Sequence, residues 1–139
     1  MEETAILSPM LALAFLTFVI GALVPIRRFS KKHKLTQADF ELGESARVPA
    51  VVSLPNRNFA SLFEAPVLFY PAMLAFYVTA TADAVAVGLA WAYVALRAVH
   101  SIVHVTSNIV RWRALAFSLS MLALMGLWGL LAGRMLTAG

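Results

Sequence analysis

Four ionisable side chains lie inside stretches of the sequence that are otherwise apolar. Glu64 lies in one such stretch, and Arg97, His100 and His104 lie in another. A charged residue at the centre of a membrane-spanning helix costs about 2.5–3.5 kcal/mol on insertion scales, so it needs a polar partner or a water-filled cavity. These residues therefore predict either an ion pair that fixes helix packing or a polar pocket between helices.

The polar side chains of the second stretch share one face of the helix that they predict. Successive residues of an α-helix are rotated by about 100°, so side chains three, four and seven positions apart lie on the same side. The side chains that fall within an arc of roughly 80° on this helix are Tyr93, Arg97, His100, His104, Asn108 and Arg111. On the preceding apolar helix, Arg57, Ser61 and Glu64 share a face in the same way.

Depth in the membrane connects the two faces. Glu64 and His100 each lie about six residues, or about 9 Å, inside the charged end of their helices, and Arg97 lies one turn deeper. A Glu64–Arg97 ion pair with His100 beside it would therefore offset the cost of desolvating both charges. Such a pair could serve packing alone, or it could belong to a ligand pocket.

A ligand pocket is favoured by the number of polar groups that converge. Arg57, Arg111 and Arg113 would stand at its mouth, and forked guanidinium groups match carboxylates in bidentate fashion. The expected ligand is a small molecule that carries carboxylates. Two histidines four residues apart could also bind a metal ion, but only Glu64 could join them, so no metal site is predicted.

The composition indicates what kind of protein must position these residues. Of 139 residues, 61% are hydrophobic and 13% are charged, whereas soluble domains carry about a quarter charged residues. We therefore expect an integral membrane protein with a single domain over residues 1–139. The chain contains no cysteine, so disulfides, a zinc–thiolate framework and a cysteine nucleophile are excluded.

Four stretches are long and apolar enough to cross about 30 Å of hydrocarbon, which takes about 20 residues. They predict an all-α four-helix bundle with spans at residues 4–26, 58–81, 84–105 and 113–133, and a hydrophilic loop at residues 27–57. Asp83 is expected to cap the third helix. Pro66 and Pro71 lie inside the second span, where a neighbouring helix must bind the backbone carbonyls that they leave free.

The distribution of Lys and Arg predicts how these spans are oriented. Nine of these residues lie in the connections after the first and third spans, whereas Arg134 alone lies on the opposite side. Because basic residues collect on the cytoplasmic side, both termini are expected to be non-cytoplasmic in this multi-pass protein. Contact with membrane lipid headgroups then accounts for the basic excess, and binding of nucleic acid is not expected.

At these residues the sequence resembles the MAPEG family, the membrane-associated proteins in eicosanoid and glutathione metabolism. The likeness covers nearly the whole chain: four spans, a basic segment after the first, RAVHSIVH at residues 97–104, and, as in bacterial members, NFASLFEAP at residues 58–66. The resemblance implies a homotrimer that binds glutathione between subunits near the cytoplasmic side. A bacterial-type member would lie in the inner membrane.

Position by position, the resemblance assigns roles to individual residues. Glu64 corresponds to a glutamate that contacts glutathione, and Arg97 with His100 corresponds to an Arg-x-x-His motif. His104 stands where characterised members have a tyrosine that contacts the tripeptide. Arg113 stands where those members have an arginine that lowers the pKa of the glutathione thiol.

The chain also departs from the family pattern. With Glu64 aligned, Ala60 and Ser61 occupy the Arg and Asn positions of an Arg-Asn-x-x-Glu motif. Ala114 and Phe117 replace the Ser and Tyr that follow the catalytic arginine. These departures bear on the activity more than on the fold.

Two functions therefore stand as alternatives. One is a glutathione-dependent transferase or peroxidase that acts on lipophilic electrophiles, and the other is a non-catalytic MAPEG-fold membrane protein that binds lipid or acts as a scaffold. In the first, Arg113 is catalytic and glutathione is held by Arg57, Asn58, Glu64, Arg97, His100, His104, Asn108 and Arg111.

Overall fold

The protein is all-helical over residues 3–137, which are the residues that the structure, a computed structural model, describes. The main helices are α1 (Leu7–Arg28), α2 (Ala50–Ser61), α3 (Pro66–Val78), α4 (Ala84–Val105) and α5 (Val110–Thr137). Short 3-10 turns cover Glu3–Ile6, Lys31–His33 and Gln37–Asp39. The described residues form no β-strand beyond one isolated bridge, between Glu41 and Gly43.

Four helical segments are long and apolar enough to cross a membrane, as the composition predicts. They are Thr4–Arg28, Ala50–Val78, Ala84–Val105 and Val110–Thr137. The second begins earlier than the expected residue 58, so the hydrophilic connection is shorter than the expected 27–57. The fourth likewise begins before residue 113 and continues past residue 133. Hydropathy locates the hydrocarbon layer, whereas helices continue into the polar region beyond it, which explains the difference.

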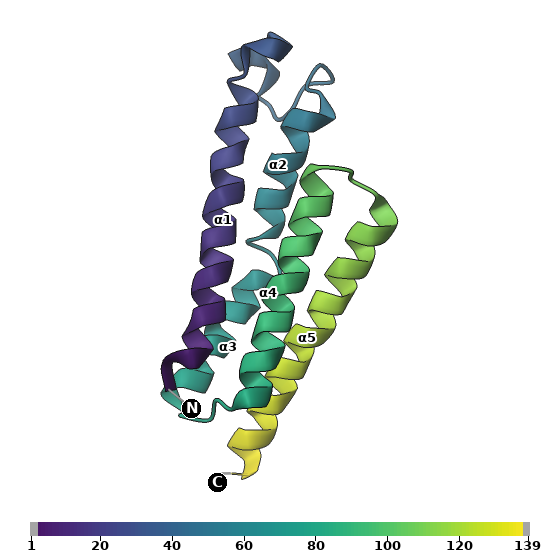
Figure 1. The fold of residues 1–139 in the computed structure, drawn as a ribbon. Coiled ribbons are helices and arrows are strands. Elements are labelled where there is room, and N and C mark those ends of the chain that lie inside the picture. The colour runs from purple at the N-terminus through teal and green to yellow at the C-terminus, as the bar shows by residue number, and fades with distance from the viewer. Residues whose placement is uncertain (1–2, 138–139) are drawn as a thin grey trace.

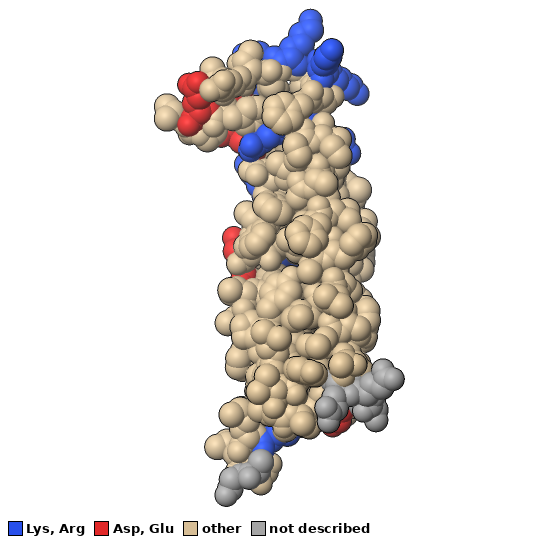
Figure 2. Space-filling model, turned by 90° about the vertical axis from the view of Figure 1, so that its left-hand side faces the viewer, with Lys and Arg blue, Asp and Glu red and all other residues tan. Residues whose placement is uncertain are grey.

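The helices form an elongated bundle in which α4 lies among the others. It packs against α1, α2 and α5, and α3 packs against α1 and α5. Figure 1 shows both chain termini at one end of the bundle and the connection between α1 and α2 at the other. Lys and Arg gather at that second end, above a body whose surface is mostly uncharged (Figure 2).

Close packing between α1 and α2 depends on a glycine. A Cβ atom added to Gly21 would lie 2.9 Å from the Cε2 atom of Phe59, a distance too short for two carbon atoms in van der Waals contact. Deeper in the bundle, Phe69 of α3 stacks on Tyr93 of α4 with ring centroids 4.6 Å apart. Both rings are fully buried, so the apolar core reaches the start of the polar face on α4.

The second membrane-spanning segment is broken at its middle. Residues 62–65 form a turn between α2 and α3, and Pro66 starts the new helix. Pro66 has no N–H group, so the carbonyl of Leu62 cannot make the usual bond to the residue four positions later. The turn is closed by shorter bonds, in which the amides of Phe63 and Val67 donate to the carbonyls of Ala60 and Glu64.

An ion pair closes the end of the bundle that carries the termini. Asp83 caps α4, as predicted, by accepting a hydrogen bond of 2.9 Å from the backbone N–H of Ala86. Arg134 of α5 donates to the Asp83 carboxylate at 2.5 Å and to the carbonyl of Thr81. The hydrogen bond from Arg134, followed by that from Ala86, lowers the pKa of Asp83 below its usual value.

Replacing Asp83 with Asn should remove a pH-dependent part of the stability. Because the folded-state pKa is lowered, the ionised carboxylate stabilises the fold above its unfolded-state pKa of about 3.9, and this contribution is lost as the pH falls through the folded-state value. Unfolding by dodecyl sulfate at pH 7 and near pH 3 should therefore differ more for the wild type than for Asp83→Asn, which retains an N-cap. Equal pH dependence in both proteins would contradict this role.

Candidate functional site

The polar face of α4 lies inside the bundle. Tyr93 and Arg97 are fully buried, and His100 and His104 are buried. The predicted polar face is therefore present as far as His104. It does not continue to Asn108 and Arg111, because α4 ends at Val105; a regular helix through those residues was the wrong assumption.

Arg97 binds the broken end of α2. Its Nη2 group donates to the backbone carbonyl of Ser61 at 2.8 Å and to the Ser61 hydroxyl at 3.3 Å. Ser61 is the last residue of α2, where a cation is favoured by the helix dipole. Arg97 therefore binds a carbonyl left free by the end of α2. The carbonyl that Pro66 itself leaves free is that of Leu62, so the expectation that a neighbouring helix binds the carbonyls freed by the prolines stays a prediction.

Glu64 does not form the ion pair expected with Arg97 inside this chain. The ion pairs among the described residues involve the carboxylates of Asp39, Glu44 and Asp83, and Glu64 is exposed. The expectation assumed a continuous helix through residue 64, but α2 ends at Ser61 and Glu64 lies in the turn. A contact between Glu64 and the polar face of a neighbouring subunit stays a prediction.

Asn58 of α2 is bonded to Ser101 of α4 and to Ser61 of its own helix. Its Oδ1 atom accepts hydrogen bonds from the hydroxyl of Ser101 at 3.3 Å and from that of Ser61 at 3.4 Å. Asn58 and Ser101 are both fully buried. Sequence reasoning missed Ser101, although its position four residues after Arg97 places it on the same helix face.

His100 connects this buried group to α5. Its Nδ1 atom lies 3.1 Å from the backbone carbonyl of Arg113, so Nδ1 carries the proton and donates. The ring of His100 contacts that of His104 edge-on, with centroids 5.4 Å apart. No group of three His, Cys, Asp or Glu side chains within residues 3–137 could hold a metal ion.

Several polar atoms of this face are buried without a hydrogen-bond partner among the described residues. Arg97 uses one of its nitrogens, while its Nε and Nη1 groups have no partner. The others are the Asn58 amide nitrogen, the Tyr93 hydroxyl, Nε2 of His100 and Nδ1 of His104. Buried polar groups are almost always hydrogen-bonded, so such a cluster indicates a place for water or a ligand.

A second group of predicted residues meets at the charged end of the bundle. The Nη1 group of Arg113 donates to the side-chain oxygen of Asn108 at 2.6 Å. Asn108 has a left-handed backbone, with φ of 49°, which Asn tolerates better than most residues. Asn108 and the exposed Arg57 line a cavity of about 270 Å³, together with Val48, Ala50, Ser53 and Leu54.

The structure therefore places the predicted site residues in two sets and leaves two residues outside both. Asn58, Arg97, His100 and His104 lie together inside the bundle. Arg57, Asn108 and Arg113 lie at its charged end, joined to the first set by the contact between His100 and the Arg113 carbonyl. Glu64 and Arg111 are exposed and belong to neither set in the single chain.

Comparison with known proteins identifies the family of the chain. A model of the MAPEG family matches residues 6–133, which is nearly the whole chain. This protein belongs to the MAPEG family. No curated protein and no solved structure matches it.

Replacing Arg97 with Met should destabilise this MAPEG protein by about 1.5–3 kcal/mol, which is typical for a lost hydrogen bond to a charged group. Met has a similar length but leaves the Ser61 carbonyl without its donor. The midpoint of unfolding in dodecyl sulfate measures the change. Arg57→Met is the matched control, since Arg57 is exposed and surface substitutions change stability by less than about 0.5 kcal/mol. Similar losses in both variants would refute the special role of Arg97.

Proposed function

We propose that this MAPEG protein is a glutathione-dependent transferase or peroxidase that acts on lipophilic electrophiles. The main support is the buried Arg97: its guanidinium is fully buried, two of its nitrogens have no partner, and no carboxylate of the described residues pairs with it. A buried cation without a carboxylate in direct contact is costly. An anionic ligand nearby would lower that cost, and glutathione carries two carboxylates.

Two further arginines fit the same ligand. Arg57 lines the cavity at the charged end, and Arg113 is bonded to Asn108, which lines it as well. A cation beside a thiol favours the thiolate and lowers its pKa by about 1–3 units. In this proposal Arg57 binds a glutathione carboxylate, and Arg113 stabilises the sulfur anion that attacks the electrophile.

The nucleophile is the glutathione thiolate itself. The chain has no cysteine, so the proposed reaction needs no protein nucleophile. A lipophilic electrophile would arrive through the bilayer, because many large apolar side chains are exposed along the helices. Residues of the buried set, Asn58, His100 and His104, would hold the tripeptide through their free polar atoms.

Assembly into a homotrimer is part of the proposal. Glu64 is exposed in the single chain, and an unpaired carboxylate facing lipid is costly, so a neighbouring subunit or a ligand held there would stabilise it. Gly88 and Gly129 have open space beside them within the chain, and small residues allow close approach of membrane helices. The site would then be completed between subunits, with Arg111 at its rim.

Calorimetric titration of glutathione into the detergent-solubilised protein tests this function. We expect measurable heat of binding for the wild type and a weaker affinity for Glu64→Ala, because the carboxylate would bind the ammonium group of the tripeptide. The mass of both proteins in the same detergent, from light scattering, should remain that of three chains. Absence of binding to a correctly assembled wild-type trimer would refute the proposal.

Variants of Arg113 distinguish a catalytic role of this residue from simple membrane anchoring. If it stabilises the thiolate, ultraviolet difference spectra of bound glutathione should show a thiolate band at neutral pH, and Arg113→Lys should weaken this band. An anchoring residue would snorkel to headgroups, and Lys would serve as well. A band that survives Arg113→Ala unchanged would assign Arg113 to anchoring only.

The proposal places the protein in the inner membrane, with an orientation that follows from its charge. Lys and Arg collect at the end opposite the termini (Figures 1 and 2), and this end is expected to be cytoplasmic. A phosphatase reporter fused after Gly139 should therefore be active, since such reporters fold outside the cytoplasm. Activity of a cytoplasmic reporter at the same place would reverse the orientation.

A non-catalytic MAPEG protein that binds lipid or acts as a scaffold is the second candidate. The observation that favours it is Phe117, whose ring lies 5.8 Å from the Arg97 guanidinium and 5.9 Å from the His100 ring. This apolar ring stands beside the proposed ligand groups at a position where catalytic relatives are expected to carry Tyr. The titration above distinguishes the two candidates, because the second predicts no affinity for glutathione.

A further inference from the structure

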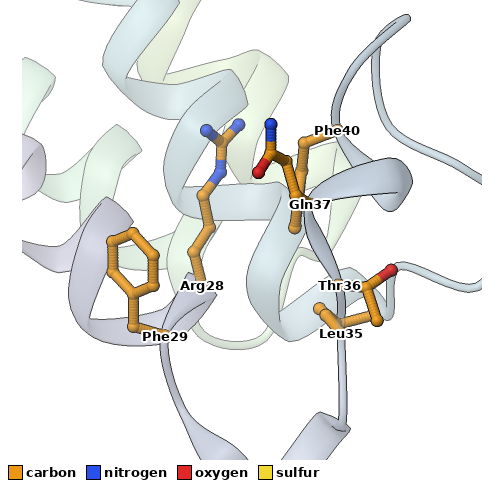
Figure 3. Close-up of a pocket in the computed structure, with 6 residues that line it drawn as sticks. All are labelled: Arg28, Phe29, Leu35, Thr36, Gln37 and Phe40. Atoms are coloured by element: carbon orange, nitrogen blue, oxygen red, sulfur yellow. The ribbon is translucent and has the colours of Figure 1, made fainter.

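A separate cavity lies at the charged end of the molecule, away from the polar face of α4. Its volume is about 400 Å³. Arg28 and Phe29 border it from the end of α1, and the other lining residues follow in the connection to α2. Figure 3 shows the six lining side chains, which are Arg28, Phe29, Leu35, Thr36, Gln37 and Phe40.

Arg28 is the only charged residue that lines this cavity, and its charge is poorly neutralised. Its guanidinium lies over the ring of Phe40, 4.6 Å from the centroid, and its Nε group is buried without a partner. The nearest carboxylate, that of Glu44, is 3.9 Å away. Glu44 also accepts hydrogen bonds from Ser53 and Asn56, so its charge is shared among three donors.

Asp39, one of three acidic residues in the connection between α1 and α2, does not neutralise the basic residues around the cavity. Asp39 is buried and accepts hydrogen bonds from the Thr36 amide at 2.8 Å and the Ser45 hydroxyl at 2.7 Å, with Arg47 at 3.6 Å. These contacts, led by the Thr36 amide, lower the pKa of Asp39. Asp39 therefore stabilises the conformation of the connection between α1 and α2.

Basic side chains dominate the side of this end near α1. Lys31, Lys32 and Lys34 follow α1 directly and are exposed. In Figure 2 the basic groups of this end rise on one side, while acidic groups gather on the other. Glu44, the carboxylate within ion-pair distance of Arg28, neutralises only part of the positive charge that borders the cavity, which favours an anionic ligand.

The position of the cavity along α1 places it at the membrane surface. Ile26 is the last apolar residue of α1 before Arg27 and Arg28, and it is 66% exposed; the ring of Phe29 is 84% exposed. Apolar side chains this exposed next to a basic cluster fit the boundary between acyl chains and headgroups. Any anion held by Arg28 would therefore lie at headgroup depth.

We propose that this cavity binds the phosphate headgroup of an anionic phospholipid. Arg28 contacts the phosphate from inside the cavity, and Lys31 and Lys32 add charge from its edge. The acyl chains extend along Ile26 and Phe29 into the hydrocarbon. This lipid site is independent of the proposed glutathione site, with which it shares no lining residue.

Native mass spectrometry of the detergent-solubilised chain tests the site with phosphatidylglycerol and phosphatidylcholine of identical acyl chains. We expect preferential retention of phosphatidylglycerol. Arg28→Gln should weaken that retention about fivefold, the effect expected for one basic residue at a membrane surface. Arg47→Gln is the matched control, because it removes the same charge from the same end of the molecule but outside the cavity. Equal losses in both variants would mean diffuse surface attraction and overturn the proposal.

A cavity-filling variant tests the site without changing its charge. It provides the decisive test in case Arg28→Gln does not fold. Gln37→Trp places a large ring in the cavity, so phosphatidylglycerol retention should fall while phosphatidylcholine retention stays the same. Unchanged retention of phosphatidylglycerol would overturn the site. Glycerol phosphate, which lacks acyl chains, should compete poorly; displacement of the lipid by glycerol phosphate at equal concentration would assign the cavity to a free phosphate compound and overturn the lipid proposal.

Discussion

The interior of this membrane protein depends on the contact between Arg97 and the end of α2. A proline at position 66 breaks the second span within the hydrocarbon, where a free carbonyl has no water to bind. Arg97 reaches from α4 and donates to the Ser61 carbonyl. One guanidinium thus stabilises the broken helix and joins two spans, at the cost of a buried positive charge.

That buried charge determines the character of the rest of the polar face. Asn58, bonded to Ser61 and Ser101, adds neutral polar groups beside the Arg97–Ser61 contact, and His100 links the face to the backbone of α5. None of these groups is an anion, so the interior carries more positive charge than the chain neutralises. The additional unpartnered donors are what make this region suited to an anionic ligand rather than to packing alone.

The two ends of the bundle differ in how far their charged side chains neutralise one another. Near the termini, Arg134 and Asp83 neutralise each other and tie α5 to the start of α4. At the opposite end, Asp39 is engaged within its own segment and Glu44 is shared among several donors, which leaves a surplus of basic side chains. The first end is closed by its own ion pair, while the second presents positive charge to headgroups and small anions.

The sequence by itself determined the class of fold, the polar face of α4 as far as His104 and the cap at Asp83, because these depend on local composition and on helical periodicity. MAPEG membership likewise followed from motifs along the chain. Only the tertiary structure decided the partner of Arg97 and the place of Glu64. Both depend on the helix break after Ser61, which rotates every later residue away from the face that a continuous helix would give it. The grouping of Arg57, Asn108 and Arg113 also required the fold, since the turn after Val105 brings together residues that no single helix connects.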